Sequence, residues 1–125
     1  MDIKKMIEMT ELTKVDTEQL VSEINNNFIN LYKEKNLRSY LKTLSNMLEL
    51  AIHLKFDFVL KYFGTAPIVA TNERIQFQEI FKCLGTRKSN KNWFLNLFAL
   101  LLGAAFVFDF DVPQIEKNFF EKKSS

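Results

Sequence analysis

Glu49, His53 and Asp57 are best placed by type and spacing to bind a metal ion, because they follow one another at intervals of four. In a continuous helix this spacing puts the three side chains on one face, where they could chelate a divalent cation. The same stripe also carries arginine, lysine and asparagine, which is typical of a solvated face with pairs of opposite charge. HExxH and CxxC spacings are absent. We therefore expect a solvated face, no metal site and no cofactor, with a small metal-dependent enzyme as the weakest alternative.

Nucleophilic and acid–base catalysis find little support in the other residues. Cys83 would need a neighbouring base, and His53 is the sequence's single imidazole. Asp109 and Asp111 could act as paired carboxylates, but Asp111 is more simply explained as the N-cap of a following helix. The three glycines are isolated, so phosphate-binding loops, GxSxG turns and dinucleotide fingerprints are absent. We expect a protein that is not an enzyme.

A basic cluster surrounds the sequence's single tryptophan. Its members are Lys82, Arg87, Lys88 and Lys91, with Trp93 directly after them. Lysine and arginine neutralise phosphates, and an aromatic ring can stack on a base. These five residues form a candidate nucleic-acid-binding site, although a tryptophan that opens an apolar helix is more often part of the core.

Helices must position these side chains, since apolar residues recur every three or four positions along most of the chain. Asp16 and Asn36 are suitable N-caps, and Gly64 and Gly85 are suitable helix stops. The pattern predicts helices over residues 16–35, 36–63, 72–85 and 93–108, and a last helix that begins after Asp111. We expect an all-α fold: a single domain over residues 1–125, built as a bundle of four main helices plus one or two short ones. Residues 1–15 and 121–125 should be flexible or loosely docked.

The helix predicted over residues 93–108 is almost uniformly apolar, which predicts a place in the middle of the bundle. Phe98 and Phe106 should both be core residues there. Two stretches, Leu50–Phe58 and Ala104–Phe110, share a hydrophobic run followed by Phe-Asp-Phe. The matched stretch is too short to indicate an internal repeat.

Phenylalanine is unusually frequent, with thirteen residues in a chain of 125. Most of them fall on the inward stripes of the predicted helices, and each ring buries roughly 150–250 Å². The last quarter of the sequence is different, because four rings crowd into it and little chain is left to cover them. We predict that these four form the partner-binding surface: Phe108, Phe110, Phe119 and Phe120.

Two family resemblances accompany these patterns. Asn92-Trp93, followed by Phe98 and Gly103-Ala104, is similar to the signature that opens the central helix of Bcl-2-like proteins. That family continues through three further helices, whereas only 32 residues follow Trp93 here.

The second resemblance covers more of the chain. Tyr62-Phe63-Gly64, Arg74, Phe81-Lys82 and Trp93 resemble small HEPN-domain proteins of four to five helices. The Arg…His ribonuclease motif of that family is missing, because Leu100 and Ala105 stand in its place. The resemblance therefore implies a catalytically degenerate domain without ribonuclease activity.

Composition narrows the class and origin of the protein. A net charge of +2 lacks the strong bias of a dedicated nucleic-acid binder. The single cysteine and the charged N-terminus without a hydrophobic leader predict the cytoplasm, or the host-cell cytosol for a viral protein. The uncharged run from Trp93 to Phe108 is shorter than the roughly 20 residues of a membrane span. Frequent Lys, Asn and Phe indicate an AT-rich genome, such as that of a low-GC bacterium, its phage or a virus.

The function that these features favour is a small non-enzymatic protein-interaction module. It would serve as an inhibitor, immunity protein or regulatory subunit, and would bind a protein partner or a second copy of itself as a homodimer. The alternative is a nucleic-acid-associated regulator that uses the basic residues around Trp93.

Overall fold

The structure is a computed structural model that describes residues 1–13 and 16–124, with side chains up to Lys122. The predicted all-α class is confirmed: the described residues contain seven helices and no strand, and 73% of the chain is helical. Five helices are longer than three turns and two are short, so the bundle has more helices than expected. Their bounds are α1 Ile3–Glu8, α2 Thr17–Glu34, α3 Leu37–His53, α4 Asp57–Tyr62, α5 Glu73–Gly85, α6 Lys91–Val107 and α7 Val112–Ser124.

The chain divides into two compact units. One unit comprises Met1–Gly64 with Asp111–Ser125, and the other comprises Thr65–Phe110. The first therefore holds α1–α4 and α7, and the second holds α5 and α6. That residues 1–125 form one domain stays a prediction.

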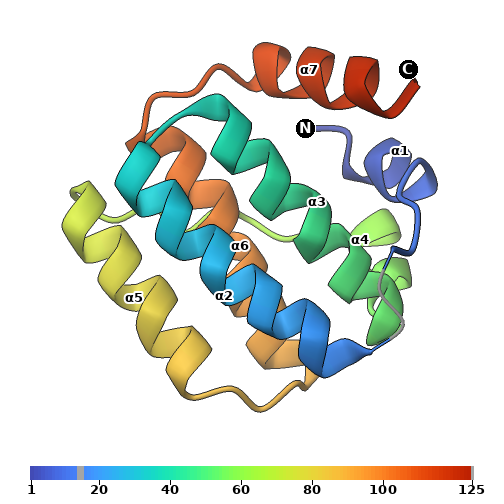
Figure 1. The fold of residues 1–125 in the computed structure, drawn as a ribbon, viewed down its shortest axis with the longest axis horizontal. Helices are drawn as coiled ribbons and strands as arrows, with labels where there is room; N and C mark the ends of the chain where they lie inside the picture. Colours follow the sequence, from blue (N-terminus) through green and yellow to red (C-terminus); the bar gives the residue numbers. More distant parts are fainter. Residues whose placement is uncertain (14–15, 125) are drawn as a thin grey trace. The chain divides into compact units, whose positions relative to one another are not determined.

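A helical hairpin of α2 and α3 forms the centre of the first unit, where the two helices run side by side (Figure 1). The Asp16 carboxylate accepts a hydrogen bond from the Glu18 amide at the start of α2, as its sequence position predicts. Asn36 caps α3 in the same way, by accepting from the Ser39 amide at 2.9 Å. The hairpin core is built from apolar residues of both helices, namely Leu20, Ile24, Phe28, Leu31, Tyr40, Leu44, Met47 and Leu48.

The long helix predicted over residues 36–63 is wrong, because the chain turns between α3 and α4. Lys55 adopts a left-handed conformation with φ 65°. Its amide donates to the Ile52 carbonyl and the Phe56 amide donates to the Ala51 carbonyl, which is the bond pattern of a Schellman motif. Glycine usually occupies this left-handed position, so the lysine gave no sign of a helix end.

The N-terminal segment, for which loose docking was predicted, contains α1. Met6 and Ile7 of this helix are buried, and α1 packs against α3 and α4. Beyond α1, the Glu49 carboxylate accepts hydrogen bonds from the amide and the hydroxyl of Thr13 at 2.9 and 2.8 Å. Residues 14–15 and 125 lie outside the described part of the chain.

The second unit pairs α5 with α6, and residues 65–70 cross α6 as a strap (Figure 1). The Ile68 amide donates to the Ala99 carbonyl of α6. The fully buried side chain of Gln76 donates to the Ile68 and Leu100 carbonyls at 2.8 Å and accepts from the Ala70 amide at 2.7 Å. Gly103 makes room for this crossing, since a Cβ there would lie 1.8 Å from the Ile68 carbonyl oxygen.

Most of α6 is buried, as its composition predicts, but not all of it. Phe98 is fully buried, whereas Phe106 is 54% exposed, so its assignment to the core is wrong. Along the described chain no single helix is long and apolar enough to cross a membrane, although α6 and Val112–Lys122 pass together as a bent pair by length and composition.

The helices α3 and α6 end in the same way, but their equivalent residues are offset by two positions from the match between the two Phe-Asp-Phe runs. Asn36 and Asn90 cap helices of the same length, α3 and α6, each of 17 residues. Each helix ends in a Schellman motif with a left-handed residue, Lys55 or Asp109. The same sequence interval separates every equivalent pair: Lys35 and Ser89 with positive φ, Asn36 and Asn90, Lys55 and Asp109, Phe56 and Phe110, and Asp57 and Asp111.

Candidate interaction site

The stripe of Glu49, His53 and Asp57 does not form one helical face. The turn at Lys55 separates Asp57, the first residue of α4, from the other two. Glu49 is 4% exposed and bonded to Thr13, so it is not part of a solvated surface. Within the described residues no group of three His, Cys, Asp or Glu side chains is placed to hold a metal ion.

His53 lies one turn of α3 beyond Glu49, close to the start of α2. Its Nδ1 is 3.5 Å from the Thr17 hydroxyl oxygen, and its Nε2 is buried without a hydrogen-bond partner in the described part of the chain. Glu49 and His53 therefore face the residues that lead into α2. This arrangement fixes that segment on α3 rather than presenting groups to a substrate.

The four predicted partner-binding phenylalanines pack mainly against other side chains. Phe108 lies between Phe77 and Phe110, with ring centroids 5.4 and 5.5 Å away. Phe119 is 2% exposed and makes an edge-on contact with Phe120, whose ring is covered by the Lys5 ammonium at 4.6 Å. The two pairs lie in different units.

A cluster of exposed aromatic side chains that was not predicted lies on α4 and at the residue directly after it. Phe58, Tyr62 and Phe63 are 61%, 58% and 78% exposed. The Phe58 ring is 4.8 Å from that of Tyr62 and 6.3 Å from that of Phe63, so the three rings form one cluster. The Lys4 ammonium lies 5.3 Å from the Tyr62 ring centroid. We name these three aromatic residues the α4 cluster.

The α4 cluster was not predicted from the sequence, because the predicted helix over residues 36–63 carried one helical periodicity through the turn at Lys55. In that register Phe58 joins the inward apolar stripe of a long helix. The turn at Lys55 resets the register, and Leu60 is then the buried residue of α4. The available signal was the density of aromatics just before Gly64.

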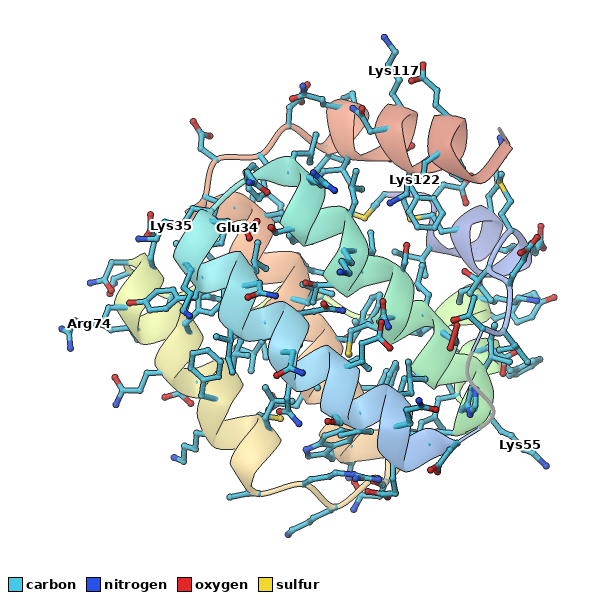
Figure 2. All side chains as sticks on the ribbon, viewed as in Figure 1. Glu34, Lys35, Lys55, Arg74, Lys117 and Lys122 are labelled. Atoms are coloured by element: carbon cyan, nitrogen blue, oxygen red, sulfur yellow. The ribbon has the colours of Figure 1, made fainter. Side chains whose placement is uncertain are left out.

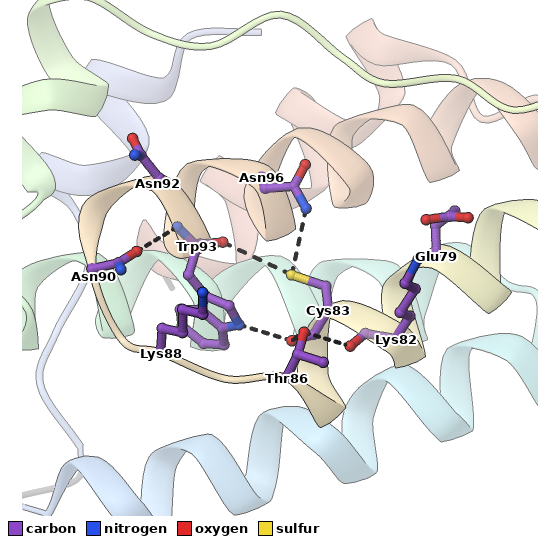
Figure 3. A pocket seen from close by; sticks show the side chains of 9 residues that line it. All are labelled: Glu79, Lys82, Cys83, Thr86, Lys88, Asn90, Asn92, Trp93 and Asn96. Carbon is purple, nitrogen blue, oxygen red and sulfur yellow. Dashed lines mark hydrogen bonds between the residues drawn. The ribbon is translucent and has the colours of Figure 1, made fainter.

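Two of the four basic residues near Trp93 line an open pocket of about 460 Å³ between α5 and α6 (Figure 3). Lys82 and Lys88 line it, together with Glu79 and three asparagines. Arg87 is not in its wall, and the Arg87 Nε donates to the Ser89 hydroxyl oxygen at 2.6 Å. Lys91 is exposed on the first turn of α6.

Trp93 cannot stack on a base in this arrangement. Its side chain is 7% exposed, and its Nε1 donates to the Cys83 carbonyl at 2.8 Å (Figure 3). The indole therefore joins the end of α5 to the start of α6. Lys82 and Lys88 can still bind an anion, but the predicted stacking of the Trp93 ring on a base is not possible in this arrangement.

Cys83 lines the same pocket as an unreactive thiol. Burial raises the pKa of this thiol, and the hydrogen bond from the Asn96 amide to Sγ, at 3.6 Å, offsets only part of that rise. A thiol with a raised pKa stays protonated at neutral pH and is a poor nucleophile.

Comparison with known protein families, with curated proteins and with solved structures finds no match to this chain. The resemblances to Bcl-2-like and HEPN-domain proteins therefore gain no support. The exposed rings of the α4 cluster have no evident packing role within the described part of the chain.

Proposed function

We propose that this protein is a small interaction module that contacts other proteins through the α4 cluster. The observation that supports this function most directly is the exposure of Phe58 and Tyr62 on α4 and of Phe63 directly after it. Surface patches of contiguous apolar side chains on small proteins usually mark partner sites. Aromatic residues are also the side chains that most often dominate binding energy.

The fold itself gains little from these three rings. Leu60 is the buried residue of α4, and Phe56 makes no side-chain cap at its start. Replacing an exposed ring should therefore change stability little, within about 0.5 kcal/mol. Exposed aromatic rings that contribute little to stability favour a binding role.

A second copy of the chain is the partner that we propose first. The three rings expose about 400 Å² together, if a full aromatic side chain offers about 200 Å². A standard interface buries about 800 Å² per partner. Self-association through the α4 cluster alone should therefore be weak and concentration-dependent. A weak homodimer suits an inhibitory or regulatory module, because the second copy can dissociate and leave the same surface to another protein.

The first test measures mass in solution. Sedimentation equilibrium of the wild-type protein between about 10 µM and about 1 mM should show a rise toward the dimer mass. Phe63→Ser should weaken association at least about tenfold, because it removes the most exposed ring of the cluster.

Phe106→Ser is the matched control, because Phe106 is an exposed phenylalanine outside α4. It should leave the association unchanged. A wild-type protein that stays monomeric over the whole range would contradict the proposed self-association, and equal effects of both variants would contradict the role of α4.

A further inference from the structure

A second pocket, of about 430 Å³, lies within the first unit, and its lining is strongly polar. Residues of α2 and α3 form most of the wall, and Lys122 of α7 completes it. Its charged side chains are three cations, Arg38, Lys42 and Lys122, and one carboxylate, Glu34. The pocket therefore carries a net positive charge and favours an anion.

The cations present their charges from two different helices. Arg38 and Lys42 are one turn apart on α3 and both are exposed, so their heads can reach the same bound group. Arginine offers a planar fork of N–H donors that fits two oxygens of one anion. The Glu34 carboxylate is held at the wall by the Ser39 hydroxyl, which donates to it at 2.5 Å.

Asn27 supplies an independent indication that this pocket can bind a polar ligand. Its side chain lines this pocket, yet the residue is only 4% exposed. Its Nδ2 is buried and has no hydrogen-bond partner among the described residues. Burying an amide donor without a partner costs about 1–3 kcal/mol, so such groups usually mark a bound water or ligand.

We propose that this pocket binds a small phosphorylated molecule, with the phosphate held by Arg38, Lys42 and Lys122 and with the Asn27 amide donating to it. The volume exceeds that of a free phosphate and lies in the usual range for small-molecule sites. Two further asparagines in the wall can hydrogen-bond the rest of the ligand. The site is separate from the α4 cluster and does not depend on the proposed self-association.

The test uses inorganic phosphate, AMP and citrate as probes, at constant ionic strength set with sodium chloride. Isothermal titration and thermal melts of the full chain should show saturable binding of phosphate and tighter binding of AMP. Citrate serves as a polycarboxylate control that carries more negative charge than either phosphate compound at neutral pH. Tighter binding of citrate than of both phosphate compounds would overturn the assignment to phosphate.

Two lysines of the same helix provide a matched pair of variants. Lys122 lines the pocket, whereas Lys117 does not, and their side chains leave α7 in different directions (Figure 2). Lys122→Gln and Arg38→Gln should each weaken AMP binding about threefold to tenfold, the range for one charged contact at an accessible site. Lys117→Gln should not weaken it. Equal loss in both lysine variants would show a nonspecific charge effect and overturn the proposal.

Asn27→Asp tests the amide directly, because it places a carboxylate where the phosphate is proposed to bind. It should abolish AMP binding at neutral pH, while Asn27→Gln retains part of it. As a readout independent of stability, the side-chain amide signal of Asn27 in ¹H–¹⁵N spectra should shift during the AMP titration. An unshifted signal at saturation, or no saturable response to phosphate and AMP, would refute the site.

Discussion

Gly103 determines whether the strap can cross α6, because no other residue fits beneath the Ile68 carbonyl. A Cβ at this position would lie 1.8 Å from that oxygen and 2.8 Å from the Gln76 Nε2. Either the strap lifts and the Gln76 hydrogen bonds break, or α6 shifts. Both outcomes remove packing and leave a buried amide unpaired.

We therefore expect Gly103→Ala to lower the free energy of unfolding by about 2–4 kcal/mol, as measured in urea melts. Gly85→Ala is the control, since a Cβ at Gly85 would meet nothing within 4 Å. That substitution should be neutral or slightly stabilising. Equal melting midpoints for wild type and Gly103→Ala would contradict the close approach.

At the scale of elements, the break between α3 and α4 depends on a lysine in a left-handed conformation. Such a conformation costs a residue with a Cβ about 1 kcal/mol, and glycine avoids this cost. Lys55→Gly should therefore raise the free energy of unfolding by about 0.5–1 kcal/mol in urea melts.

Lys61→Gly supplies the opposite expectation, because Lys61 lies inside α4. A glycine there should destabilise the protein by up to about 1 kcal/mol. If Lys55→Gly destabilises the protein as much as Lys61→Gly does, the turn is not the left-handed one described above.

The helix boundaries show which signals a sequence carries. Asp16, Asn36 and Asn72 each cap the helix that was predicted to follow, because a short polar side chain satisfies the first free amides. Lys55 and Asp109 end helices without a comparable sign. Their left-handed turns are stabilised by backbone bonds and by the packing around them, and no residue type announces either.

At the scale of the whole molecule, the tyrosines and the tryptophan report on different units. Tyr32, Tyr40 and Tyr62 all lie in Met1–Gly64, and Trp93 lies in Thr65–Phe110. Chains of this size usually unfold in one cooperative step. Tyrosine absorbance, Trp93 fluorescence and far-ultraviolet circular dichroism should therefore give the same urea midpoint. Separate midpoints for the tyrosine and tryptophan signals would contradict the prediction of a single domain.

The exposed surface was the part that the sequence could not give, because exposure depends on how distant segments pack. Two phenylalanines show that exposure was predicted wrongly in both directions, once too high and once too low. Phe119 lies in the C-terminal helix α7 but is 2% exposed, whereas Phe106 lies in the most apolar helix but is 54% exposed. Helical periodicity gives the spacing of side chains, and only the tertiary arrangement determines which of them stay in contact with water.

The strap also determines where foreign sequence can be inserted. An insertion between Ile68 and Ala70 would separate the two backbone groups that the Gln76 side chain binds together. Lys88 is exposed in the loop that joins α5 to α6, and an insertion beside it would interrupt the hydrogen bond between the Arg87 and Ser89 side chains rather than a buried contact with another helix. A fluorescent or affinity label inserted beside Lys88 should therefore leave the fold intact.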